Sequence, residues 1–229
     1  VTKLAPAMGA EITGIDLGSS DFSDNLIGEI RAVWLEHNML VLRGQNLTPQ
    51  QQLRLAEAFG DPDIYPFLDG VDGIPEITAV LKREHETVNF GGVWHTDTSY
   101  QKLPPMATML QAIELPPIGG DTLFANQEMA YERLSDGLKE TLGGLRVICA
   151  AGKAKVAATR TARIKESGKS VDIDELVASH PAIRTHPETG RRSLYVSPGH
   201  AVRFDGWTEE ESAGLLLSLI HISEPTRPL

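Results

Sequence analysis

The stretch that decides the fold reads GGVWHTDTSYQKLPPMATMLQAIELPPIGGDTLFAN and covers residues 91–126. After a glycine pair, polar and apolar residues alternate, and two apolar segments follow that are separated by proline and glycine turns. This pattern predicts strands at residues 104–115 and again before residue 126. His95 and Asp97 stand two positions apart near its start. Because side chains two apart on a strand point to the same face, we expect this imidazole and this carboxylate to lie side by side.

An imidazole beside a carboxylate is the beginning of a 2-His-1-carboxylate site, which binds non-haem Fe(II). The third ligand of such a site would be a histidine from a distant strand. The His-x-Asp pattern alone is weak evidence for a metal site. Among the 7 histidines of the chain, about 0.4 are expected to have an aspartate two positions later by chance. A hydrogen-bonded pair at a strand edge is the alternative that these residues leave open.

The rest of the chain reads as helices and short strands. Apolar residues recur at helical spacing in three segments, at residues 24–38, 48–60 and 126–145. Thr48 is the expected N-cap of the second segment, and Gly60 its C-cap. Short apolar or alternating runs predict strands at residues 39–44 and 76–84, and a hairpin within residues 180–200. Early helices followed by many short strands favour a β-sandwich or barrel with helices packed outside.

Composition excludes several classes of function. The 31 acidic side chains outnumber the 21 of Lys and Arg, so the formal net charge is −10. Such an acidic surface repels phosphate backbones, and no nucleic-acid partner is expected. No run of 18 apolar residues is present, so no membrane partner is expected either. The single cysteine, Cys149, excludes an internal disulfide and predicts a cytoplasmic protein, in which this residue is a buried small side chain.

Four segments together resemble the taurine dioxygenase-like (TauD/TfdA) family of Fe(II)- and 2-oxoglutarate-dependent oxygenases. They are MGAEITGIDL, HNMLVLRGQNLTPQQQLRLAEAFGD, residues 91–126 and HPAIRTHPETGRRSLYVSPGH, in the family's order. The resemblance runs from Leu4 to about Leu216. It implies a mostly β fold with flanking helices, a double-stranded β-helix (jelly-roll). It also implies that O2 is used to hydroxylate a small organic anion, of sulfonate or carboxylate type, with release of succinate and CO2.

The resemblance assigns roles to residues of the quoted stretch. His95 and Asp97 would be the catalytic residues and two of the three iron ligands. Thr122, in GGDTLF, would contact a carboxylate of the co-substrate 2-oxoglutarate through its hydroxyl. A cross-strand contact is the alternative for this threonine.

The resemblance also indicates a substrate pocket. Tyr65, Phe90 and His200 are expected to form its walls, with ordinary packing as the alternative. Taurine-oxidising members have a His, a Tyr and an Asn where this chain has Tyr65, Leu68 and Gly91. Taurine itself is therefore not the expected substrate, whereas another small organic anion is.

The last residues resemble a translated sequencing adapter, since residues 217–227 read LSLIHISEPTR. We therefore expect a single, incomplete jelly-roll domain at residues 1–216, with a lid at residues 153–179, and a non-native tail at residues 217–229. A genuine helix end is the alternative. On this expectation the family's second ligand histidine and its Arg for 2-oxoglutarate are missing, His221 does not replace them, and this chain has little activity.

Two other classes of function remain open at this point. One is a jelly-roll binding module without a working iron centre, and the other is a cupin-like metal enzyme. Thr122 favours the oxygenase, because a simple binding module has no use for a co-substrate hydroxyl. Two further histidines, His85 and His180, are expected at the surface. The sequence leaves open whether the chain forms a homo-oligomer.

Overall fold

The computed structural model describes residues 1–19, 22–86, 90–153, 164 and 169–223. The chain divides into two compact units. The first unit comprises residues 1–79 and 107–122, and the second comprises residues 80–106 and 123–229. The boundary of a single domain at Leu216 stays a prediction. None of the helices in these described ranges has the length and the apolar run that crossing a membrane requires.

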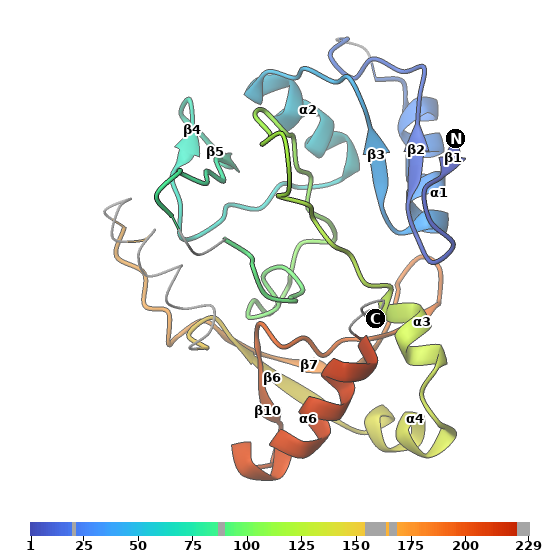
Figure 1. Cartoon of the computed structure of the whole chain (residues 1–229), viewed down its shortest axis with the longest axis vertical. Coiled ribbons are helices and arrows are strands. Elements are labelled where there is room, and N and C mark those ends of the chain that lie inside the picture. The colour runs from blue at the N-terminus through green and yellow to red at the C-terminus, as the bar shows by residue number, and fades with distance from the viewer. Residues whose placement is uncertain (20–21, 87–89, 154–163, 165–168, 224–229) are drawn as a thin grey trace. The chain divides into compact units, whose positions relative to one another are not determined.

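The first unit is built on a three-stranded sheet with the order β1 (Thr2–Lys3), β2 (Ala10–Ile12) and β3 (Leu40–Leu42). Strand β2 is antiparallel to β1 and parallel to β3. The parallel pair requires a crossover, which helix α1 (Asp24–His37) supplies, and this helix packs against the sheet (Figure 1). Its N-cap is Ser23, whose side chain accepts a hydrogen bond from the backbone of the first turn.

Helix α2 (Pro49–Phe59) begins and ends where its sequence predicts. Thr48 and Gln51 form a reciprocal capping box, a proline occupies the first turn, and Gly60 is the C-cap. A short hairpin of β4 (Gly70–Val71) and β5 (Ile74–Thr78) follows. The core of the first unit consists of buried aliphatic side chains from the sheet, both helices and the adjoining loops, namely Ile12, Leu17, Ile30, Leu47 and Leu55.

The second unit contains an antiparallel sheet with the order β10 (Ala201–Phe204), β6 (Arg146–Ala150) and β7 (Val177–Pro181). A separate hairpin pairs β8 (Ile183–Thr185) with β9 (Arg192–Leu194), as predicted for residues 180–200.

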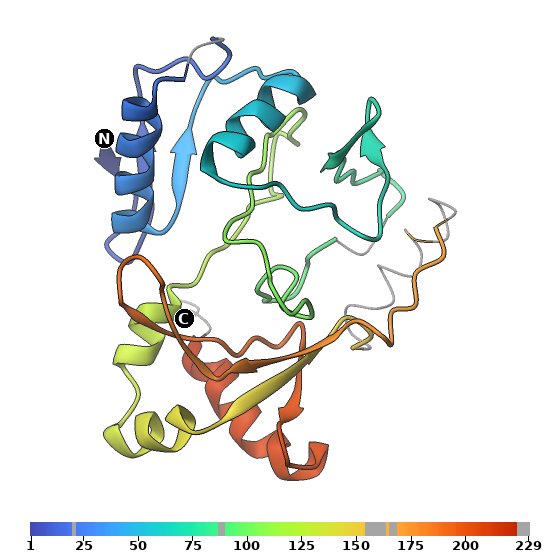
Figure 2. The same cartoon turned by 180° about the vertical axis from the view of Figure 1, so that it is seen from behind.

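Helices α3 (Gln127–Glu132), α4 (Asp136–Gly143) and α6 (Glu209–Ser223) accompany these strands. The first two form the helix pair expected within residues 126–145. Helix α6 lies against the sheet, as Figure 2 shows from behind.

Residues 217–223, which the sequence marks as part of a non-native tail, form the second half of α6. Leu219 is fully buried, and Leu216 is 7% exposed in the core of the second unit. Their partners in that core include Leu142 of α4 and Phe204 of β10. This part of the segment is therefore packed against the second unit, and the origin of residues 217–229 stays a prediction.

The strands predicted within residues 104–126 are not formed, and this prediction was wrong. Ile113 is 83% exposed and Ile118 is 90% exposed, so neither side chain lies in a sheet face. The proline pairs remove backbone donors, and Gly119 and Gly120 both have positive φ angles, which interrupts a regular ladder. The described residues thus form four small sheets among helices, a mixed α/β arrangement, where a mostly β jelly-roll was expected.

Cys149 on β6 is buried, as predicted, with 2% of its surface exposed. Burial raises the pKa of its thiol to about 11. With that pKa only about 0.1% of the thiol is thiolate at pH 8, against about a quarter for an unperturbed cysteine. We therefore expect a thiol reagent such as DTNB to label the folded protein at least ~100-fold more slowly than the urea-unfolded chain. Equal rates would show that Cys149 is accessible in the folded state.

Candidate active site

His95, Thr96 and Asp97 lie in a loop that continues into a turn, not on the strand that their alternation predicts. The chain bends because Thr98 adopts the left-handed conformation, with φ 47°. Residues 94–99, here called the HTD loop, still bring the two side chains together. The distance between His95 Nε2 and Asp97 Oδ1 is 3.0 Å, and both side chains keep access to solvent, with 30% and 52% exposed. The expected juxtaposition is confirmed, although the backbone achieves it differently.

The imidazole of His95 is held by the backbone of its own loop. Its Nδ1 lies 2.7 Å from the carbonyl oxygen of Val93, and because a carbonyl only accepts, Nδ1 carries a proton. Nε2 is the ring nitrogen that faces Asp97 Oδ1. A metal-binding histidine is held in the same way, with its second nitrogen donating to a carbonyl or carboxylate.

The donor atoms fit a metal ion in chemistry and in spacing. A neutral imidazole lone pair and a carboxylate oxygen 3.0 Å apart repel one another unless a proton or a cation lies between them. Adjacent ligands that each bind an ion at about 2.1 Å are roughly 3 Å apart. Within the residues that the structure describes, no group of three or more His, Cys, Asp or Glu side chains is placed to hold a metal. The assignment of His95 and Asp97 as two of the three iron ligands stays a prediction.

His200, which the sequence predicts in a pocket wall, lies directly beneath the HTD loop. It is 1% exposed, and its ring lies edge-on to those of His95 and Tyr100, with centroid distances of 6.1 and 5.1 Å. Its Nδ1 lies 3.1 Å from both the carbonyl oxygen of Thr96 and the hydroxyl of Ser99. Contact with a substrate stays a prediction, whereas contact with the HTD loop is present in the structure.

His180 was predicted at the surface, and this prediction was wrong. The residue is 5% exposed on β7, and its Nε2 lies 2.8 Å from the carbonyl oxygen of Ser99 and 3.0 Å from that of Gln101. The alternation of strand β7 turns its side chain inward. Sequence reasoning missed both His180 and Ser99 as residues of this region, because their contact joins segments about 80 positions apart.

Burial lowers the pKa of His180 below its usual 6.5, and the positive charge of Arg184 acts in the same direction. The unfolded chain therefore binds this proton more readily than the folded one. Stability is then expected to fall as the pH drops below about 6.5, and to stop falling below the lowered pKa. The prediction is checked by urea unfolding at pH 7.5 and 5.5. His180→Gln keeps a donor near the Nε2 position but does not titrate, so it should lose less stability than the wild type between pH 7.5 and 5.5. Equal losses of stability in the two proteins would contradict the assignment to His180.

The remaining sequence-predicted residues are divided between the two units. Thr122 is exposed and belongs to the first unit, in a stretch without regular structure. Tyr65, also of the first unit, is half-buried and packs edge-on against the buried Phe67, with ring centroids 5.2 Å apart. Phe90 is half-buried in the second unit. The contacts of these residues with a co-substrate or substrate stay predictions.

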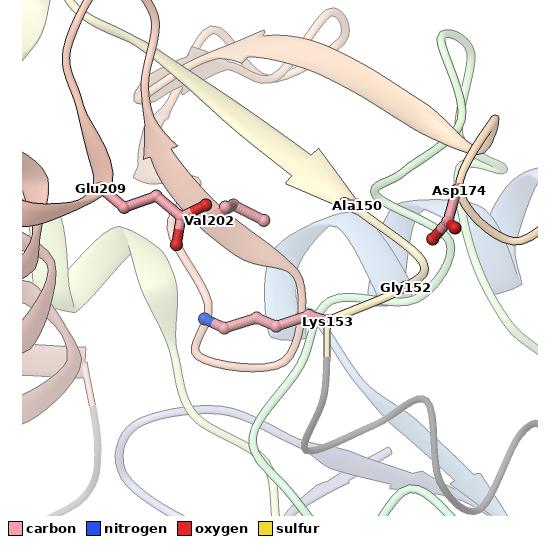
Figure 3. A pocket seen from close by; sticks show the side chains of 6 residues that line it. All are labelled: Ala150, Gly152, Lys153, Asp174, Val202 and Glu209. Atoms are coloured by element: carbon pink, nitrogen blue, oxygen red, sulfur yellow. The ribbon is translucent and has the colours of Figure 1, made fainter.

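A shallow pocket of about 390 Å³ lies elsewhere in the second unit (Figure 3). The side chains of Lys153, Asp174 and Glu209 line this pocket. The Lys153 ammonium donates to the carbonyl of Ala201. None of the predicted site residues lines this pocket, so it is separate from the His95–Asp97 pair. Most of the predicted lid, residues 154–163 and 165–168, lies outside the described residues, and its last part begins strand β7.

Comparison with known proteins supports the resemblance. Residues 1–227 match the family described as taurine catabolism dioxygenase TauD, TfdA family. An alkylsulfatase from Acinetobacter baylyi is 32% identical over 234 residues, covering 99% of this chain and 70% of the relative. An alpha-ketoglutarate-dependent sulfonate dioxygenase from Saccharomyces cerevisiae is 30% identical, covering 100% of this chain and 56% of the relative.

The fold is matched as well. The crystal structure of a protein described as a putative alpha-ketoglutarate-dependent taurine dioxygenase from Burkholderia xenovorans superimposes with a TM-score of 0.79 at 34% identity. The match covers 99% of this chain and 75% of that one. The family match extends to residue 227 and gives no support to an end of the native sequence near Leu216. The chain belongs to the TauD/TfdA family of alpha-ketoglutarate-dependent dioxygenases, which confirms the enzyme class that its motifs predict.

Proposed function

We propose that the protein is an Fe(II)- and 2-oxoglutarate-dependent dioxygenase that oxidises a small organic anion and releases succinate and CO2. The observation that carries the proposal is the pair of donor atoms, His95 Nε2 and Asp97 Oδ1, 3.0 Å apart. Imidazole and carboxylate are the ligand types of non-haem Fe(II) sites. When bound, the iron and 2-oxoglutarate supply the activation of O2 for attack on a C–H bond.

In this proposal, His95 and Asp97 bind the metal. The carbonyl of Val93 accepts a hydrogen bond from Nδ1 of His95, so that Nε2 is the nitrogen left to bind a cation. Asp97 supplies negative charge at the same point. Thr122 is proposed to donate its hydroxyl to a carboxylate of 2-oxoglutarate. We also propose that this protein has the double-stranded β-helix fold, and its structural match to a taurine dioxygenase-like protein supports this.

We propose a sulfonate or sulfate ester as the first substrate class to test, with carboxylates as the second. Two relatives support this choice, the alkylsulfatase and the sulfonate dioxygenase. Taurine is proposed to be a poor substrate, because Tyr65 and Gly91 stand where taurine-oxidising members have a His and an Asn donor. Tyr65, Phe90 and His200 are the proposed contacts of the substrate.

The test is succinate formation from 2-oxoglutarate with Fe(II), ascorbate and O2, in the presence of a linear alkyl sulfate, an alkanesulfonate, a phenoxyalkanoate or taurine. In a version of the protein that also carries the family's second ligand histidine and its Arg, the expected result is succinate formation that one of the first three anions stimulates and taurine does not. This chain by itself is expected to form little succinate. Metal binding without succinate from any of them would overturn the proposal in favour of a non-catalytic binding module. Oxidation of taurine at the rate of the others would overturn the substrate assignment alone.

A further inference from the structure

The segment Ser197–Pro198–Gly199–His200, here called the SPGH segment, contacts the HTD loop along its length. The backbone N–H of Gly199 donates to the carbonyl of Trp94 at 2.9 Å. The backbone N–H of Thr96 donates to the hydroxyl of Ser197 at 3.4 Å. His200 Nδ1 lies 3.1 Å from the carbonyl oxygen of Thr96, and since that oxygen only accepts, Nδ1–H is the donor. Together with the contact between Ser99 Oγ and His200 Nδ1 at 3.1 Å, these hydrogen bonds join two segments about 100 residues apart.

The close approach of His95 also requires a glycine at position 199. A Cβ atom at position 199 would lie 2.6 Å from His95 Cβ, closer than real Cβ atoms approach, and at a tight 3.1 Å from the carbonyl oxygen of Trp94. A Cβ at Gly91 would lie 3.3 Å from His95 Cε1. Glycine at both positions leaves the room in which the imidazole sits.

The SPGH segment is itself anchored to the sheet of the second unit. The carbonyl of His200 accepts from the backbone N–H of Ala150, at the end of β6, at 3.0 Å. Strand β10 begins at the next residue, Ala201, and pairs with β6. His200 and Ser99 are 1% and 2% exposed, so their contact is shielded from water. The HTD loop, which has no strand ladder of its own, takes its position from this sheet.

We propose that the SPGH segment positions His95 and Asp97 for metal binding, with His200 holding the loop backbone and Gly199 providing the space for His95. His200 is on this view a positioning residue that acts through Thr96 and Ser99. The inference rests on the proposed metal site and goes beyond it, because it assigns a structural task to a residue predicted to contact the substrate. It also explains why a histidine with two polar contacts is buried here.

The experiment compares His200→Leu with His200→Asn, since the amide nitrogen of asparagine can replace Nδ1–H as the donor to Thr96. Affinity is measured by anaerobic titration with Co(II) as the probe. Exposure of the loop is measured by amide hydrogen exchange of residues 94–99 in the metal-free protein. His200→Leu is expected to bind Co(II) roughly 10- to 100-fold more weakly and to exchange faster. His200→Asn should stay within a few-fold of the wild type in both measurements.

Gly199→Ala is expected to lower Co(II) affinity in the same range, because the added methyl group displaces His95. Gly214→Ala is the matched control, since this position on α6 has an ordinary φ and no atom within 4 Å of the added Cβ. Thermal unfolding of each variant shows whether it folds. If Gly199→Ala does not fold, the His200 pair decides the question.

The outcomes separate the two proposals. If the wild type binds no Co(II) or Fe(II), the metal site is wrong, whereas the exchange rates still report whether His200 holds the loop. If the wild type binds metal and His200→Leu keeps both its affinity and its slow exchange, the positioning role is wrong. A changed KM for substrate in both His200 variants, with unchanged metal affinity, would instead assign this residue to the substrate pocket.

Discussion

Replacing Asp97 with asparagine is expected to weaken Fe(II) or Co(II) binding by at least ~100-fold, more than the loss of a supporting residue, which costs about 10- to 100-fold. The carboxylate is one of two donor groups that the described residues place at this point, 3.0 Å from His95 Nε2. An amide keeps the shape but loses the negative charge, so the cation is no longer attracted. Succinate formation should fall with the affinity.

The stability of the metal-free protein should barely change in this variant. The Asp97 side chain is 52% exposed, and ion pairs in such places contribute little. Asp172→Asn, at an exposed aspartate of the same unit, is the control for the loss of one negative charge. Unchanged metal affinity in Asp97→Asn, measured with Co(II) in the absence of 2-oxoglutarate, would remove this residue from the metal site.

Leu219→Ala is expected to destabilise the protein by about 2–5 kcal/mol, the usual cost of emptying a filled core position. The side chain is fully buried on α6, in the cluster that contains Leu142 and Phe204. Leu217→Ala is the matched control, because this leucine lies two residues earlier on the same helix and is 55% exposed. Its change should stay within about 0.5 kcal/mol.

The measurement is urea unfolding followed by tryptophan fluorescence. One of the three tryptophans, Trp207, lies edge-on to Phe204 with ring centroids 5.4 Å apart. A large loss confined to Leu219→Ala would show that residues 217–223 belong to the packed second unit. Equal, small effects of both substitutions would show that this helix end does not contribute to the core.

Much of the local structure was predictable from sequence because its causes are local. Helix α2 follows from Thr48, Gln51 and Gly60, whose capping interactions join residues within one turn. The hairpin of β8 and β9 follows from the turn at residues 187–190. In contrast, the strands expected within residues 104–126 failed, because a strand exists only when a partner completes its ladder.

Only part of the candidate site, likewise, was predictable from local sequence. The two-residue spacing of His95 and Asp97 brought their side chains within reach of one another, and the sequence by itself determined this pair. Whether it lay on a strand or in a turn, and which groups held it, was decided by tertiary structure.

The burial of His180 and the contacts of Gly199 and His200 depend on segments 80 to 104 positions away in the chain. No periodicity or local propensity encodes such contacts. They form only when the sheet of the second unit brings these segments together and excludes water from the hydrogen bonds between them.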